Sequence, residues 1–213
     1  MENRKEKHYH YNMNIDTAKL KGRHIFLEKL AEHHKETLRQ LAKDERIWEG
    51  NRGFLLNETF DTQFDHYFST AMDNRAMGGQ QAFVMYTIAG REIIGMTRLL
   101  NIDEKEKRAE IGYTWYIPAV WGKVFNKECK LLLLRYSFEE LLFNRVQFNV
   151  AGQNIRSQKA VEKIGGVKEG ILRKHGYRND GSPKDTVIFS IINDEWTCVK
   201  EKLLQMIAKS END

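Results

Sequence analysis

The sequence predicts one domain of the α/β or α+β class, built around a mixed sheet. Stretches with the two-residue alternation of strands are interleaved with stretches of helical spacing along most of the chain. The 213 residues are 41% hydrophobic and 30% charged, which is typical of a globular protein with a substantial core. Collagen-like, disordered and disulfide-scaffold classes are therefore excluded, and two full domains are not expected.

The N-terminal segment is expected to stand apart from this domain. Residues 1–14 are polar and show no sustained periodicity, which predicts a disordered lead-in before a single domain over residues 15–213. His8 and His10 favour a solvated tail over a metal site, because no further ligand at metal-site spacing is nearby. His33 and His34 are neighbours that cannot share one helix face. We therefore expect no metal site.

The first half of the domain is expected to end in a run of three strands. Aromatic side chains at helical spacing over residues 61–77 are typical of a helix that contributes to the core. Gly90 and Arg91 separate two β-prone runs, which predicts a hairpin, and the next run stops at Pro118. The expected elements are a strand over residues 24–30, helices over 31–43 and 61–77, and strands over 82–89, 92–100 and 108–117.

The second half alternates helices and strands. Asn154 is a favourable N-cap, and Gly165 with Gly166 is a typical helix stop. The expected elements are a helix over residues 126–143, a strand over 145–150, a helix from 154 to 165, strands over 167–177 and 185–192, and a C-terminal helix that extends from about 194. The long helix is expected to bury Leu131, Leu134, Phe138, Leu141 and Leu142.

The composition of the sequence limits the expected cellular location of the protein and its expected binding partners. The longest apolar leucine run, residues 131–134, is far too short for a membrane span, and the N-terminus lacks a secretory signal. Two cysteines, Cys129 and Cys198, fit a reducing compartment, so the cytoplasm is the expected location. The formal net charge of +4 is too small to indicate nucleic-acid binding.

The loop over residues 118–126 is a candidate phosphate site. It joins a strand end to a long helix and contains Gly122 and Lys123, and helix N-termini present unpaired N–H groups. Residues 121–175 carry 11 Lys and Arg against 5 Asp and Glu, a net charge of +6. This local excess of positive charge favours a small phosphate-bearing molecule.

The strand before this loop carries a carboxylate. Regular alternation would place Glu110, Gly112, Thr114 and Tyr116 on one face, so that Glu110 is aimed together with small polar side chains. The alternative interpretation is a solvated charge at a strand end that pairs with a neighbouring basic residue.

Several motifs, in order along the chain, resemble the GNAT superfamily of N-acetyltransferases, most closely its RimJ/RimL type. The resemblance spans about residues 20–196. It rests on residues 109–118 (AEIGYTWYIP), 121–128 (WGKVFNKE), 154–157 (NIRS), 161–166 (VEKIGG) and 169–173 (EGILR).

The resemblance implies a twisted, mostly antiparallel mixed sheet with helices on both faces, splayed between its fourth and fifth strands to hold acetyl-CoA. Backbone groups of Tyr113, Trp115 and Ile117 would pair with the pantetheine arm. The other implied cofactor contacts are the loop and helix-start residues Trp121, Gly122, Lys123, Val124, Phe125 and Asn126, together with Asn154, Arg156 and Lys159. The loop of the family usually reads Arg or Gln, two residues, Gly, one residue, and Gly or Ala, and Trp121, Val124 and Asn126 depart from this pattern at its three signature positions.

The same resemblance implies direct acetyl transfer to an amine, which needs a base, an oxyanion donor and an acid for the departing sulfur. Glu110 is the first candidate for the base and His175 the second, while Ser157 matches the serine near the CoA sulfur. Ser157 and Asn154 are also what a helix start needs. The acceptor site would be lined by Trp48, Phe54, Tyr67 and Asp185, although aromatic residues such as the first three more often belong to the core.

The leading hypothesis is an acetyl-CoA-dependent N-acetyltransferase that acts on a peptide or protein N-terminal α-amine. One alternative keeps the reaction but takes a small amine, such as a polyamine or an aminoglycoside, as acceptor. Another is a non-catalytic module that binds CoA or associates with the ribosome. A homodimer is compatible with each hypothesis.

Overall fold

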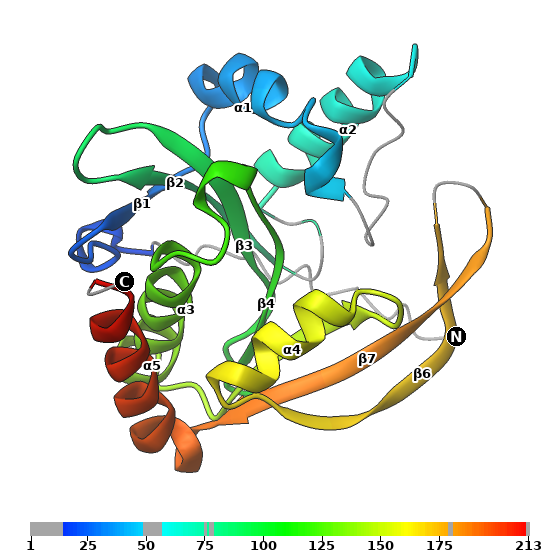
Figure 1. The fold of residues 1–213 in the computed structure, drawn as a ribbon. Coiled ribbons are helices and arrows are strands. Elements are labelled where there is room, and N and C mark those ends of the chain that lie inside the picture. Colours follow the sequence, from blue (N-terminus) through cyan, green and yellow to red (C-terminus); the bar gives the residue numbers. More distant parts are fainter. Residues whose placement is uncertain (1–14, 49–56, 75, 77–78, 179–180, 212–213) are drawn as a thin grey trace, which may run out of the picture.

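Seven strands form one sheet in the order β1-β2-β3-β4-β5-β7-β6 in the computed structural model, which describes residues 15–48, 57–74, 76, 79–178 and 181–211 (Figure 1). Neighbouring strands are antiparallel except β4 and β5, which are parallel. The strands are β1 (Ile25–Lys29), β2 (Gln81–Thr87), β3 (Ile93–Asp103), β4 (Arg108–Tyr116), β5 (Arg145–Ala151), β6 (Val167–Tyr177) and β7 (Pro183–Ile192). The predicted mixed α/β fold is confirmed.

Helices cover both faces of this sheet. They are α1 (Lys35–Leu41), α2 (Phe60–Met72), α3 (Phe125–Arg135), α4 (Ile155–Ile164) and α5 (Trp196–Ser210). In Figure 1, α1 and α2 lie together at one end of the view, whereas α3 and α5 pack against each other on the opposite side of the sheet. Each helix and strand predicted from the sequence has a counterpart among the described residues, and the ends differ by at most five residues except in the long helix predicted over residues 126–143; residues 75 and 77 of the helix predicted over 61–77 lie outside the described residues.

Strand alternation divides the core in two. On β2, Phe83 and Met85 belong to a cluster with α3, α4 and α5, while Ala82 and Val84 belong to a second cluster with α1 and α2. A strand that is buried on both faces has a continuous run of apolar residues, and residues 82–85 of β2 form such a run. The first half of the sheet is therefore fixed between two layers of helices.

The long helix predicted over residues 126–143 is shorter than expected. α3 ends at Arg135 and continues into one π-helical turn, Tyr136–Glu140, which is closed by the Leu141 N–H donating to the Tyr136 carbonyl at 3.0 Å. Leu142 then adopts a positive φ of 52° and is 67% exposed, so the prediction that it is buried was wrong. The wider turn ends the helix and directs the chain into β5.

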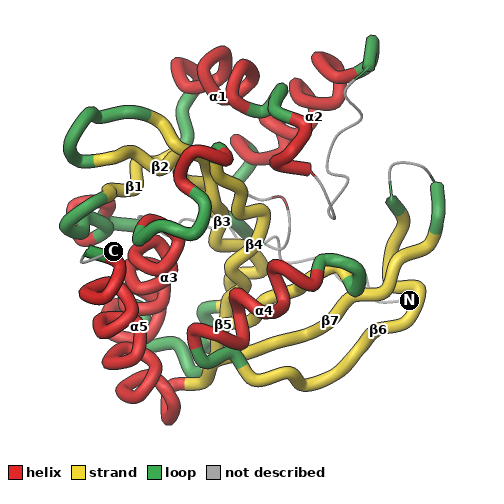
Figure 2. Tube along the Cα trace, in the orientation of Figure 1, coloured by secondary structure: helices red, strands yellow, loops and turns green. Residues whose placement is uncertain are grey.

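The C-terminal half contains a long hairpin formed by β6 and β7. Figure 2 shows this hairpin extending beyond α4. The side chains of β6 are mostly exposed, in contrast to those of β2. The helix that precedes this hairpin, α4, begins and ends as the sequence predicts. Asn154 caps its start by accepting from the Ser157 N–H at 3.0 Å, and Gly165 ends it with a φ of 107°.

Candidate active site

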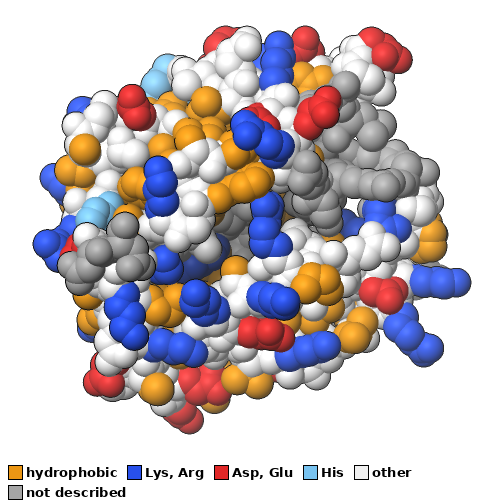
Figure 3. All heavy atoms as spheres, in the orientation of Figure 1, with side chains coloured by type: hydrophobic (Ala, Val, Ile, Leu, Met, Phe, Trp, Pro, Cys, Tyr) orange, Lys and Arg blue, Asp and Glu red, His pale blue; other side chains and the backbone are white. Residues whose placement is uncertain are grey.

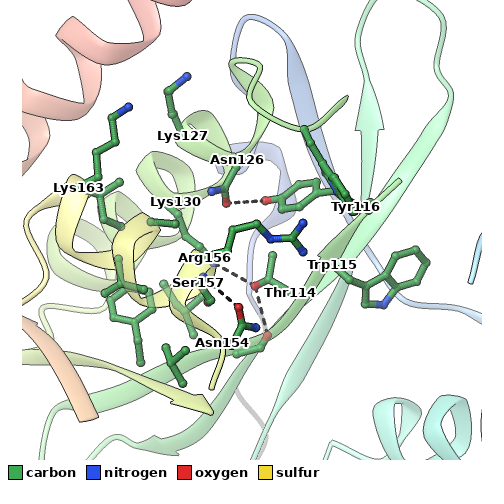
Figure 4. A pocket seen from close by; sticks show the side chains of 18 of the residues that line it. Thr114, Trp115, Tyr116, Asn126, Lys127, Lys130, Asn154, Arg156, Ser157 and Lys163 are labelled. Atoms are coloured by element: carbon green, nitrogen blue, oxygen red, sulfur yellow. Dashed lines mark hydrogen bonds between the residues drawn. The ribbon is translucent and has the colours of Figure 1, made fainter. Parts of the chain in front are cut away.

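A cavity opens where the parallel strands β4 and β5 part. The two strands pair only through their first three positions, with Glu110 opposite Gln147 as the last pair. β4 nevertheless continues to Tyr116 and β5 to Ala151. The cavity in this gap has a volume of about 430 Å³ and is lined by both strands, the 118–126 loop, α3 and α4 (Figure 4). The sheet therefore has an internal pair of strand edges available to a ligand.

A bulge in β4 faces this gap. Arg98 pairs with Gly112 and Met96 with Trp115, so Thr97 alone opposes the two residues Tyr113 and Thr114. Tyr113 takes up the extra residue with a positive φ of 49°, which is uncommon for a residue with a side chain.

The bulge changes which side chains share a face. The prediction that Glu110 and Thr114 lie on one face of β4 was wrong, because alternation is reset at Tyr113. Thr114 turns toward α3, where its Oγ1 accepts from Lys130 Nζ at 3.0 Å. Trp115 instead packs with the α1 and α2 cluster.

The loop before α3 is held by side-chain hydrogen bonds. Trp121 Nε1 donates to the Tyr116 carbonyl at 2.9 Å, and the Tyr116 hydroxyl donates to Asn126 Oδ1 at 3.1 Å. Gly122 has a φ of 76°, so glycine is favoured there. Val124, where the family pattern expects glycine, has an ordinary φ of −63° and a buried side chain. The loop therefore forms here without a second glycine.

Basic side chains surround the cavity. Among the described residues that line it, every charged side chain is a cation, namely Lys123, Lys127, Lys130, Arg156 and Lys163. The Arg156 guanidinium lies over the Trp121 ring at 4.2 Å from its centroid. On the face shown in Figure 3, Lys and Arg side chains gather around the hollow beside α3 and α4. Because the N-terminus of α3 also opens here, the site is suited to a phosphate-bearing ligand.

Glu110 lies directly behind the cavity wall. Its side chain is nearly fully buried, and its Oε2 accepts from Asn101 Nδ2 at 2.9 Å and Asn149 Nδ2 at 2.8 Å. Within the described residues, Oε1 accepts no hydrogen bond, and a Cβ at Gly112 would lie 3.3 Å from it. Burial raises the pKa of Glu110 above its ordinary value, against the opposing hydrogen bond from Asn101. Since Gly112 and Asn149 both line the cavity, a buried carboxylate with one free oxygen adjoins it.

Asn154 and Ser157 come to the cavity at the start of α4. The cap uses the Ser157 backbone N–H, so the Ser157 hydroxyl has no role in the N-cap bond. Both residues line the cavity, and Figure 4 shows them across from Thr114. The backbone N–H of Ser157 therefore takes part in the helix cap, while its hydroxyl stays available at the cavity.

Other predicted cofactor contacts lie outside the cavity lining. Val124 and Phe125 pack toward the core, and Lys159 is exposed on α4. The Ile117 N–H donates to the Ile94 carbonyl at 2.9 Å, and the Ile117 carbonyl accepts from the Val120 N–H at 3.2 Å. The backbone of Ile117 is therefore already engaged within the chain.

Of the predicted acceptor residues, Trp48 and Tyr67 both contact Trp115, whereas Asp185 lies outside the cavity lining. Trp48 is buried, donates through Nε1 to the Ala42 carbonyl, and packs on Trp115 with 5.7 Å between ring centroids. Tyr67 contacts the cavity wall, because its hydroxyl accepts from Trp115 Nε1 at 3.2 Å. Phe54 lies outside the described residues. Asp185 is exposed on β7, and its Oδ1 accepts from the Lys174 N–H.

The second candidate base also lies elsewhere. His175 is exposed on β6, outside the cavity lining, and its Nδ1 is 3.2 Å from Thr186 Oγ1. Of the two candidate bases, Glu110 is therefore the one that adjoins the cavity.

Lys130 is a site residue that sequence reasoning did not identify. It is 7% exposed, lies on the sheet-facing side of α3 and reaches the cavity between β4 and β5. Burial lowers the pKa of its ammonium group. A signal was available in the sequence, because a lysine interrupts the buried run between Cys129 and Leu131.

One further cluster combines possible metal ligands. The nearest ligand atoms of Glu28, His33 and His34 lie within 4.8 Å of one another, although adjacent histidines were expected to point apart. His34 Nδ1 accepts from the Ala31 N–H at 3.0 Å, so the ring proton belongs on Nε2, which faces Glu28 Oε1 at 3.3 Å. That nitrogen offers no lone pair to a metal ion in this arrangement. The expectation of no metal site remains a prediction.

Among the described residues, none of the helices combines the length and apolar character needed to cross a membrane.

Comparison with known proteins gives the family. Residues 24–167 match the family model described as an acetyltransferase (GNAT) domain. The chain is 36% identical over 121 residues to YdaF of Bacillus subtilis (strain 168), provisionally named a ribosomal N-acetyltransferase; the match covers 56% of this chain and 63% of YdaF. The chain spans between 56% and 63% of the length of the curated relatives it matches.

Solved structures agree with this match. A provisionally named acetyltransferase from T. thermophilus superposes with a TM-score of 0.76 at 31% identity, over 88% of this chain and 96% of that one. The fold of a spermidine N-acetyltransferase from Vibrio cholerae, solved with CoA and spermine, is similar at a TM-score of 0.64 and 22% identity, over 81% and 98% of the two chains. The chain therefore belongs to the acetyltransferase (GNAT) family.

Proposed function

We propose that the chain is an acetyl-CoA-dependent N-acetyltransferase of the RimJ/RimL type that transfers an acetyl group directly to a peptide or protein N-terminal α-amine in the cytoplasm. The observation that carries this proposal is the basic cavity at the parting of β4 and β5, beside the N-terminus of α3. This combination offers unpaired strand edges to an extended arm and positive charge to phosphates.

In this proposal the cavity-lining residues hold acetyl-CoA. The backbone of Tyr113 and Trp115 receives the pantetheine arm, while the loop amides, Lys123 and Arg156 receive the phosphates. Asn154 adds a polar contact at the start of α4. When bound, acetyl-CoA supplies a thioester carbonyl that an amine can attack.

Glu110 is the proposed base. Its free Oε1 adjoins Gly112 in the cavity wall, so it receives the proton of the acceptor through a water molecule rather than by direct contact. Because burial raises the pKa of Glu110, the carboxylate is a better base than an exposed glutamate. A backbone N–H near Tyr113 or Trp115 stabilises the oxyanion, and the Ser157 hydroxyl protonates the departing sulfur.

The choice of acceptor follows from acid–base cost and charge. At pH 7, deprotonating a lysine amine costs about 4.6 kcal/mol, but deprotonating an α-amine costs only about 1.1 kcal/mol. A water-mediated carboxylate is adequate for the second task. The uniformly cationic lining favours a singly charged amine over a polyamine, which is the ligand class of the Vibrio cholerae structure.

A thiol-release assay on the full chain tests this function. Acetyl-CoA is offered with peptides that carry a free N-terminus, with the same peptides blocked at the N-terminus but carrying an internal lysine, and with polyamines and aminoglycosides. We expect release with the first set only. Release with polyamines or aminoglycosides alone would overturn the proposed acceptor.

Calorimetric titration with acetyl-CoA separates binding from catalysis. Arg156→Ala should weaken binding, whereas Arg135→Ala, on the exposed side of α3 where it donates to the Lys19 carbonyl, should not. Binding without thiol release for any amine would favour the non-catalytic module, and no binding at high micromolar ligand would contradict the proposal outright.

A further inference from the structure

The amine of Lys130 occupies an unusual position for a lysine. Lysines are almost never fully buried unless they are paired, yet Lys130 is 7% exposed in the middle of the sheet-facing side of α3. Within the described residues, its Nζ makes one hydrogen bond, to Thr114 Oγ1 at 3.0 Å, and no carboxylate lies within ion-pair distance. The charge of this buried side chain is therefore not balanced by an acid.

Burial of Lys130 favours its neutral form, because it lowers the pKa of the ammonium group. The Phe148 ring, whose centroid lies 5.8 Å from Nζ, acts in the opposite direction, because the face of an aromatic ring attracts a cation. A neutral amine keeps a lone pair and is a nucleophile, whereas an ammonium group is not. Lys127, one turn earlier on α3, has more acceptors for its protons than Lys130. Its Nζ donates to the Gly122 and Lys123 carbonyls and to Ser210 Oγ.

The amine also reaches the proposed cofactor gap from α3. Thr114 belongs to β4 directly after the bulge, and Phe148 belongs to β5, on the other side of the parted strands. Lys130 therefore places its Nζ near a side chain of each of the two strands that we propose to enclose the pantetheine arm (Figure 4). A thioester held in this gap lies within reach of one nucleophilic amine supplied by the chain itself.

We propose that Lys130 is a self-acetylation site: acetyl-CoA bound between β4 and β5 transfers its acetyl group to Lys130 Nζ. The nitrogen lone pair forms a bond to the thioester carbonyl carbon, the carbon–sulfur bond breaks, and the proton lost by nitrogen ends on sulfur to give CoA thiol. This inference rests on the proposed binding of acetyl-CoA but not on the identity of the external acceptor.

Acetylation at this position would have two physical consequences. The amide that forms cannot take up a proton, so Lys130 can no longer add positive charge to the cavity lining when a phosphate-bearing ligand enters. The added acetyl group also occupies part of a gap whose whole volume is about 430 Å³. We therefore expect the acetylated chain to bind acetyl-CoA more weakly, which makes the reaction self-limiting.

Mass spectrometry tests the proposal directly. The purified full chain is incubated with acetyl-CoA and no acceptor, its intact mass is measured over time, and the modified peptide is mapped. We expect a gain of one acetyl group, on Lys130, that resists neutral hydroxylamine. A label removed by hydroxylamine would be a thioester, such as one on the adjacent Cys129, and would overturn the proposal.

Two variants and one control make the result specific. Lys130→Arg keeps a cation that stays protonated and cannot act as a nucleophile, and Lys130→Met removes the charge, so both should lose the acetyl gain. Lys202→Arg, at an exposed position on α5, should retain it. Thermal melting of each variant shows whether it is folded.

The controls also separate this inference from the proposed function. If calorimetry shows acetyl-CoA binding and Lys130 stays unmodified, the self-acetylation is overturned while the cofactor site stands. If the wild-type chain binds no acetyl-CoA, the proposed function fails first. An acetyl gain that persists in both folded Lys130 variants would place the modification elsewhere and contradict the inference.

Discussion

Glu110 on β4 and Glu128 on α3 are 6% and 3% exposed, yet their carboxylates have very different partners. Glu128 accepts three backbone N–H groups, from Arg23 at 2.7 Å, His24 at 2.8 Å and Ile25 at 2.9 Å, which ties the start of β1 to α3. Glu110 accepts two side-chain amides on one oxygen, and within the described residues its other oxygen accepts no hydrogen bond.

The difference shows that burial alone does not distinguish a carboxylate that stabilises the fold from one that is available for proton transfer. Backbone donors fix Glu128 in place, and both of its oxygens are engaged. Glu110 keeps an acceptor position beside a cavity, where a water molecule or an amine can use it. Substitution of each carboxylate should therefore affect a different property of the chain.

Removing the Glu128 carboxylate should mainly affect stability. In Glu128→Ala three backbone N–H groups lose their acceptor, and at about 1–3 kcal/mol for each unsatisfied group the free energy of unfolding should fall by roughly 3–9 kcal/mol. That is a large part of a typical stability of about 5–15 kcal/mol. Urea denaturation measures the loss, with Glu162→Ala at an exposed position of α4 as the control. A loss below about 1 kcal/mol would contradict the structural role.

Neutralising Glu110 should mainly affect activity. Glu110→Gln keeps the size of the side chain and an acceptor oxygen for the two asparagine amides, but it removes the base. Thiol release with a free N-terminal peptide should therefore fall by about 10²- to 10⁴-fold in kcat/KM. An unchanged kcat/KM and pH profile would exclude Glu110 from the chemistry.

The same variant should not lose stability at neutral pH. Because burial raises the folded-state pKa of Glu110, the folded chain binds the proton more tightly than the unfolded chain. The contribution of this group to stability is thus lost as the pH rises from the ordinary glutamate pKa through the raised one. We expect the melting temperature of Glu110→Gln at pH 7 to equal or exceed that of the wild type, opposite to Glu128→Ala.

Removal of the Asn101 hydrogen bond should change the pKa of Glu110 without removing its carboxylate. Its φ is 49°, so Asn101→Gly removes the amide donor at a position that glycine tolerates, away from the cavity lining. Loss of a hydrogen bond to the ionised form should raise the pKa of Glu110 further. The acidic limb of the kcat/KM profile should move up by about one pH unit, equivalent to about 1.4 kcal/mol. A shift to lower pH would contradict this assignment.

Ser157 should show the smallest effect. A thiolate is a moderately stable leaving group, with a thiol pKa near about 8.5, so loss of the proposed proton donor in Ser157→Ala should reduce kcat by roughly tenfold or less. Stability should be unchanged, because the cap uses the backbone N–H of Ser157. Asn154→Ala, which removes the cap itself, should instead cost about 1 kcal/mol. Equal losses of stability in the two variants would show that the Ser157 hydroxyl is structural.

Much of the fold was predictable because it depends on local patterns. Apolar alternation, the Asn154 cap and the Gly165 stop are properties of neighbouring residues, and the structure contains each of them. The parting of β4 and β5 was expected only through the family resemblance. It depends on pairing between strands that are far apart in the sequence, such as Arg108 with Arg145, and no local pattern encodes such pairing.

The errors have identifiable physical causes. Leu142 was expected to be buried because helical spacing was extended past Arg135, whereas a π-helical turn ends the spacing there. The face assignment of Thr114 failed because an extra residue shifts the alternation. Lys130 was passed over because a basic residue on a helix is usually solvated, and only the three-dimensional packing shows that this one is enclosed.

The bulge at Tyr113 also bears on how this strand can change in evolution. Substitutions at the positions around it alter side chains while leaving every neighbour on its own side of the sheet. Deletion of one residue there would restore regular alternation. Each side chain of β4 after the deletion would then point to the opposite face of the sheet, so that Trp115 would no longer pack with α1 and α2. Variation in this strand should thus accumulate by replacement, with insertions and deletions confined to the loops that flank it.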